Sequence, residues 1–176
     1  MMILGGWVAT VPELPVKTGL GRIIWETAEA ADKLGRRLPE LRCGTRSVSA
    51  SEAPNEAFAT FVRSVAEPES PTLTIEKLTG VFDVFLPHLV DTWERTVAET
   101  DPIADAPTIK ILEECLADAR RHIAWGRDVL DALCGSPDDD ERRRVRRAAL
   151  ESELRACGGV TGEMATGGTA PPTSEG

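Results

Sequence analysis

The sequence predicts an all-α protein: an antiparallel four-helix bundle with a kinked third helix, a short charged C-terminal helix and a disordered tail. Apolar residues recur at spacings of three and four over several long segments, which is the period of a helix with one buried face. No segment alternates apolar and polar residues as a strand would. With 176 residues and 41% hydrophobic side chains, the chain can build one core.

The N-terminal segment, residues 1–16, is expected to be an extended arm. Pro12 and Pro15 interrupt it, and a proline removes a backbone donor. Trp7 and Val8 are the side chains expected to pack onto the body.

The bundle is expected to span residues 17–135. Its first helix covers about 17–38, and a polar connection at 42–50 leads to a shorter helix at about 52–66. The face predicted to be buried in the first helix contains six apolar residues: Leu20, Ile24, Ala28, Ala31, Leu34 and Leu38.

The third helix is expected over 73–100. Pro87 lies inside it, which predicts a kink, or a break at which Pro87 opens a second segment. The fourth helix opens near Pro107 with Asp105 as its N-cap, and ends before Gly135.

Residues 136–157 are expected to form the charged C-terminal helix, with aspartates at its positive N-terminus. Its arginine run, 142–147, is interpreted as a solvated face with partners such as Glu151. Residues 158–176, rich in Gly, Thr and Pro, have the composition of a disordered tail.

The net charge of −9 and a pI near 4.8 argue against a nucleic-acid or anionic-membrane surface. Residues 1–16 lack a basic start and a sustained apolar run, so no signal peptide is expected, and no segment approaches a membrane span. The four cysteines show no CxxC spacing, which favours reduced thiols in a cytoplasmic protein.

The strongest candidate site lies on the fourth helix, where Asp118 stands one turn before His122. Both fall on an edge of the apolar stripe, beside Cys115 and Trp125, and are expected to be at least half buried. A buried carboxylate needs a partner. His122, a cation from another helix, or a metal ion would serve. His122 is interpreted first as a core histidine bonded to Asp118 or to a backbone carbonyl. The alternatives are metal ligation and an acid–base pair formed by Asp118 and His122.

Other polar residues are weaker candidates. His88 forms an HxxD pair with Asp91 and is expected near the ligand pocket with Trp125 and Cys115. Glu26 and Glu29 fall nearly opposite the predicted buried stripe of their helix and are interpreted as solvated charges. Cys115 is interpreted as a small buried hydrophobe.

Three segments resemble the ferritin-like superfamily: LGRIIWETAEAADKLGRRLPELR (20–42), LTGVFDVFLPHLVDTWERTVAETDPIADAPT (78–108) and DARRHIAWG (118–126). They look like parts of a bacterial group of ferritin-like domain proteins. The resemblance implies a bundle whose di-metal ligands are glutamates and Glu-x-x-His motifs. His122 matches one such histidine, but Ala119 stands where its glutamate would be.

Three functions follow as hypotheses. The first is a metal-depleted bundle that binds a small organic molecule or a protein partner and needs no cofactor, acting as a tailoring or accessory protein. The second is a non-haem iron or manganese oxidoreductase that uses His122, Asp118 and His88, with Glu26 or Glu29. The third is a structural bundle that oligomerises, for instance as a homodimer.

Overall fold

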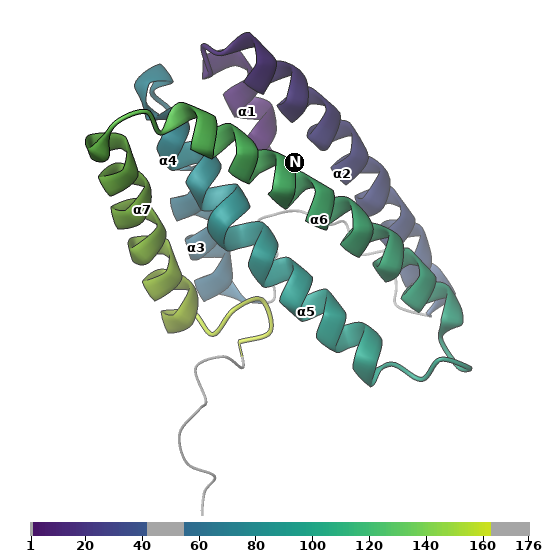
Figure 1. The fold of residues 1–176 in the computed structure, drawn as a ribbon. Helices are drawn as coiled ribbons and strands as arrows, with labels where there is room; N and C mark the ends of the chain where they lie inside the picture. The colour runs from purple at the N-terminus through teal and green to yellow at the C-terminus, as the bar shows by residue number, and fades with distance from the viewer. Residues whose placement is uncertain (1, 42–54, 163–176) are drawn as a thin grey trace, which may run out of the picture.

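The computed structural model describes residues 2–41 and 55–162, and within these ranges every regular element is helical. Figure 1 shows the long helices lying beside one another, with α7 packed across one end. In chain order, the elements are α1 (Met2–Thr10), α2 (Leu14–Glu40), α3 (Glu56–Ala66), η2 (Pro71–Leu73), α4 (Thr74–Leu78), η3 (Thr79–Phe85), α5 (Leu86–Glu99), α6 (Ala106–Leu133) and α7 (Pro137–Ala156).

The expectation of an extended N-terminal arm is wrong, because residues 2–10 form helix α1. The two prolines that suggested an extended arm fall after this helix: Pro12 lies in the connection and Pro15 in the first turn of α2, where a missing donor costs nothing. The prediction that Trp7 packs on the body is confirmed, since it is only 3% exposed.

The third predicted helix is divided by a change of helix type. The chain passes from α4 into η3, a π-helical segment, and then into α5, where Pro87 lies in the first turn. The backbone stays helical from residue 74 to residue 99, so the third helix is not broken at Pro87, which lies where the π-helical segment returns to α-helix. A π-helical segment has the hydrogen-bonding pattern i→i+5 and often occurs at functional sites.

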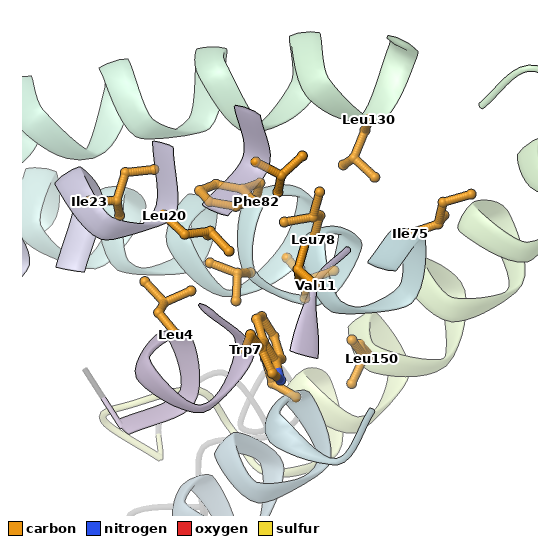
Figure 2. Close-up of a cluster of buried hydrophobic side chains, with 14 of the residues drawn as sticks. Leu4, Trp7, Val11, Leu20, Ile23, Ile75, Leu78, Phe82, Leu130 and Leu150 are labelled. Atoms are coloured by element: carbon orange, nitrogen blue, oxygen red, sulfur yellow. The ribbon is translucent and has the colours of Figure 1, made fainter. Parts of the chain in front are cut away.

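The main core lies where α1, α2, α3, α4, η3 and α7 meet. Figure 2 shows its side chains pointing toward one another from these elements and from α6. The largest fully buried apolar members are Leu20, Phe61, Leu78, Phe82, Leu130 and Leu150.

The C-terminal helix docks through its arginines, so their interpretation as a solvated face holds only in part. Arg143 donates to buried Asp83 of η3 at 2.8 and 3.2 Å, and Arg142 pairs with Glu76 of α4. The predicted pair of Arg147 with Glu151 is confirmed at 2.7 Å.

The expected boundaries of the fourth and fifth helices are close to those of α6 and α7. Asp105 holds the N-cap position of α6, but its carboxylate accepts from Arg37 and the hydroxyl of Thr108 instead of capping the backbone. The connection at 42–50 and tail residues 163–176 lie outside the described residues. None of the helices described is long and apolar enough to cross a membrane.

Candidate ligand cavity

Helix α6 turns His122 into the protein. His122 is 6% exposed and shares the buried face of α6 with Cys115, Ala119 and Gly126, spaced at three and four residues. The prediction that His122 is at least half buried is therefore confirmed.

The partner of His122 is Glu26 of α2, which the sequence pattern placed on the solvent side. The imidazole Nε2 of His122 lies 2.6 Å from Oε2 of Glu26, and the Glu26 side chain is only 12% exposed. The interpretation of Glu26 as a solvated charge is thus wrong, whereas Glu29 is exposed as expected.

The error comes from the phase of α2. Its buried face follows Val16, Leu20 and Ile23, and continues through Thr27 and Ala30 along the cavity described below. The predicted stripe ran through Ile24 and Ala28, one residue later, and one residue is about 100° of rotation. That rotation brings Glu26 from the outer surface to the inner face.

Asp118 does not pair with His122. Its carboxylate accepts from Arg121 at 2.7 Å, three residues along α6, and its side chain is 35% exposed. The predicted acid–base pair of Asp118 and His122 is therefore replaced by a pair between helices, Glu26 and His122.

The hydrogen bonds around Glu26 determine its charge state. The bond from His122 is the largest cause that lowers the pKa of Glu26, and the bond from Arg22 at 2.8 Å lowers it further, against the effect of burial. An ionised carboxylate only accepts hydrogen bonds, so Nε2 of His122 carries the proton between them. In the neutral imidazole, Nδ1 then carries the lone pair.

An inner cavity of about 260 Å³ lies beside this pair, between α2, α5 and α6. Most of its wall is apolar, and His122, Glu26, Thr27 and half-buried Asp118 supply its polar edge. The remaining lining residues are Leu4, Ile23, Ala30, Ala31, Leu34, Val81, Phe85, Leu86, Leu89, Trp93, Cys115 and Ala119.

An outer cleft of about 650 Å³ lies on the other side of the pair. It shares Ile23, Glu26 and His122 with the inner cavity, so these three side chains stand between the two spaces. The other lining residues are Leu14, Pro15, Thr18, Gly19, Arg22, Arg121 and Trp125.

Two further predicted pocket residues lie close to His122. Cys115 lines the inner cavity, and burial raises the pKa of its thiol, which agrees with a buried hydrophobe and not a nucleophile. Trp125 lines the outer cleft and not the inner cavity. Its ring packs on Gly19, where a Cβ would lie 2.1 Å from the indole.

His88, by contrast, lies apart from the pocket where it was expected. It is buried against Phe58, and its Nε2 accepts a hydrogen bond from the backbone N–H of Val160 at 3.0 Å. Gly158 and Gly159, with φ of 73° and 69°, turn the chain after α7 so that Val160 reaches this position. His88 thus contacts the turn that follows α7 and lines neither the inner cavity nor the outer cleft.

The residues present do not fit a di-metal centre. Across residues 2–41 and 55–162, no three side chains of His, Cys, Asp and Glu converge to hold a metal ion. Glu26 and His122 bond to each other, Asp118 bonds to Arg121, and His88 bonds to Val160. The predicted ligand set of His122, Asp118, His88, Glu26 and Glu29 is therefore not assembled.

Sequence reasoning missed Arg22, Thr27 and Arg121, and it placed Glu26 on the wrong face of α2. The spacing of Arg22 and Glu26, one turn apart, signals an ion pair, but nothing in that spacing says that Glu26 faces inward. A clearer signal was the pair of small residues Ala30 and Ala119, which leave space beside His122. Comparisons of the chain with protein-family models, with curated proteins and with solved structures gave no match.

Proposed function

We propose that this protein is a ferritin-like helical bundle without a di-metal centre that binds a small apolar organic molecule in the inner cavity, as a tailoring or accessory protein. One observation carries the proposal: an apolar cavity between three helices has a buried carboxylate–imidazole pair, Glu26 and His122, in its wall. Apolar pockets with a few converging polar groups are the usual form of a small-molecule site. The volume of about 260 Å³ suits a ligand smaller than a typical drug.

The pair gives the site a proton acceptor. Glu26 accepts the Nε2 proton of His122, which fixes the imidazole tautomer and leaves Nδ1 as the base. A hydroxyl or enolisable C–H of the ligand transfers its proton to Nδ1, and the anionic carboxylate of Glu26 stabilises the imidazolium. The same proton returns to the ligand, so no oxidant or reductant is consumed.

Binding of a neutral apolar fluorophore, N-phenyl-1-naphthylamine, tests the proposal. Ala30 lines the cavity, so Ala30→Phe should fill it and weaken binding by about tenfold or more. The matched control is Ala28→Phe on the same helix, because Ala28 is also partly buried but lines neither space. Absence of binding to the unmodified protein, or equal loss in both variants, would contradict the proposal.

The oxidoreductase alternative has less support, because Glu26 and His122 are the only two of its ligands that meet. Metal analysis of the purified protein discriminates between the two functions. Near-stoichiometric iron or manganese that is lost in His122→Ala would favour the oxidoreductase.

A second candidate, self-association as a homodimer, is favoured by two apolar side chains on α2. Leu14 is 73% exposed and Trp25 is 61% exposed, although large apolar residues are usually buried. Sedimentation velocity on the protein and on Trp25→Ser tests it: a dimer that the substitution dissociates supports an α2 interface, and a monomer in both contradicts it.

A further inference from the structure

We propose that the outer cleft recognises a carboxylate on the ligand, so that the ligand is a small amphipathic acid with its apolar part in the inner cavity. This inference rests on the proposed function, because it assigns the second half of the same site. It is carried by the residues that line both spaces and by the positions of the arginines, which border only the outer cleft.

The two spaces adjoin, and shared side chains stand between them. Ile23, Glu26 and His122 line both of them, and no other residue does. A molecule that fills the inner cavity and reaches past His122 therefore enters the outer cleft. Its ends meet two different environments.

The cations of the site are all on the outer side. Arg22 and Arg121 line the outer cleft, whereas the inner cavity has no lysine or arginine in its wall. Their side chains are 69% and 53% exposed, so water and ligand reach them. The apolar body of a ligand would thus lie in the inner cavity, and its acidic group would lie in the outer cleft beside the arginines.

Arg22 keeps donors for a ligand, and Arg121, whose terminal nitrogens already contact carboxylates, adds positive charge beside it. Arg22 uses Nε on Glu26, and its two terminal nitrogens have no hydrogen-bond partner among residues 2–41 and 55–162. Arg121 contacts Asp118 at 2.7 Å and Glu26 at 3.5 Å through its terminal nitrogens. The planar fork of an arginine matches the two oxygens of a carboxylate.

The walls of the cleft suit the rest of such a molecule. Leu14, Pro15 and the indole of Trp125 are apolar and border the same space as the arginines. Trp125 is positioned by its contact with Gly19 and by an edge-on contact with Phe82, whose ring centroid is 5.5 Å away. The cleft therefore offers an apolar surface with cations at its edge.

Octanoate, octanol and octyl phosphate are the probes, because they share one apolar chain and differ in the head group. Titration calorimetry at neutral pH should give octanoate about tenfold tighter binding than octanol. Arg121→Ala should remove this preference and leave octanol binding unchanged. The matched control is Arg120→Ala, a neighbour on α6 with its own ion pair to Glu94 at 2.6 Å, and it should change neither.

The α2 arginine is tested in the same way. Arg22→Ala should weaken octanoate binding, whereas Arg36→Ala, which removes an ion pair of the same spacing with Asp32, should not. Circular dichroism confirms that each variant is folded.

The outcomes separate the two proposals. Equal binding of octanoate and octanol, insensitive to Arg121, overturns the carboxylate assignment and leaves the proposed function standing. Tighter, arginine-dependent binding of octyl phosphate than of octanoate also overturns it, because the head group would then be a phosphate. Failure of all three probes and of the neutral fluorophore overturns the proposed function itself.

Discussion

Asp83 and Glu26 are two carboxylates with little exposed side chain, 2% and 12%, and their surroundings differ. Asp83 lies in the π-helical segment η3, where Arg143 binds it at 2.8 and 3.2 Å and Arg127 approaches to 3.7 Å. Glu26 lies on α2, where its buried partner is the imidazole of His122. Asp83 lines neither of the two spaces around His122, whereas Glu26 lines both.

The difference shows which of the two carboxylates points to function. An arginine keeps its charge at every physiological pH, so Asp83 and Arg143 form a fixed pair that fastens α7 to η3. An imidazole beside open space can exchange a proton with a ligand. Burial of a carboxylate is thus weak evidence for function until its partner and the adjoining space are known.

The largest expected effect is on the fixed pair. Asp83→Asn leaves the Arg143 guanidinium without its main partner, and breaking a buried pair costs about 3 kcal/mol of unfolding free energy. Urea denaturation measures it. Asp131→Asn is the matched control, because Asp131 binds the same arginine at 2.6 Å but is 69% exposed, and its loss should cost less than about 1 kcal/mol. Equal losses in the two variants would contradict the assignment of Asp83 as the structural anchor.

Two glycines that each lie against an aromatic ring allow the packed core to be compared with the wall of the outer cleft. A Cβ on Gly126 would lie 2.1 Å from the ring of Phe82, which is fully buried in the core. A Cβ on Gly19 would lie 2.1 Å from the ring of Trp125, which borders the outer cleft and has room to move. Gly126→Ala is therefore expected to cost about 2 kcal/mol of unfolding free energy, and Gly19→Ala distinctly less.

Thermal and urea denaturation of both glycine variants measure the difference. Gly21→Ala is the control, since no atom lies within 4 Å of its Cβ position and alanine favours a helix. A larger loss in Gly19→Ala than in Gly126→Ala would show that the cleft wall is as rigid as the core.

The titratable pair should show a smaller, pH-dependent effect. Glu26→Gln keeps the shape but removes the charge, and is expected to cost about 1 kcal/mol of unfolding free energy at neutral pH. The folded-state pKa of Glu26 lies below its ordinary value of 4.5, so its contribution is present above pH 4.5 and is lost as the pH falls through the folded pKa. Urea denaturation of the unmodified protein and of Glu26→Gln from pH 7 to pH 3 should show the difference in unfolding free energy shrinking. A constant difference would contradict an ionised Glu26.

Much of the architecture could be predicted from periodicity and from local boundary residues. The end of α6 and the start of α7 follow from Gly135 and the acidic turn after it, because such boundary signals act locally. Helix α1 was missed because Pro12 and Pro15 suggested an extended segment, although both fall outside the helix. The π-helical turn in η3 has no local signal in the sequence.

The candidate site was predicted only in part, and the physical reason is the width of α2's apolar face. His122 was found because α6 has a clear buried stripe. On α2, Ile23 and Ile24 are adjacent and equally apolar, so the pattern fits two rotations, and only packing against α6 selects the one that turns Glu26 inward. Pairing between helices is a tertiary property that spacing along one helix does not encode.

The smallest expected effect concerns His88, a buried histidine that lines neither the inner cavity nor the outer cleft. Its substitution tests whether such a histidine contributes to stability alone. Its Nε2 accepts the Val160 N–H, so the imidazole must be neutral there, and burial is the largest cause that lowers the pKa of His88, with Asp91 opposing and Arg95 assisting. The unfolded chain binds a proton near pH 6.5 before the folded protein does, so stability is full above that pH and falls as the pH drops toward the folded pKa. This loss of unfolding free energy between pH 7 and pH 5 should be less than about 1 kcal/mol. It should be absent in His88→Gln, which keeps an acceptor. Hydrogen exchange at the Val160 amide measures it locally: faster exchange at pH 5 in the unmodified protein than in the variant is expected, and ligand affinity should be the same in both. A loss of ligand affinity in His88→Gln would contradict the separation of the two histidines.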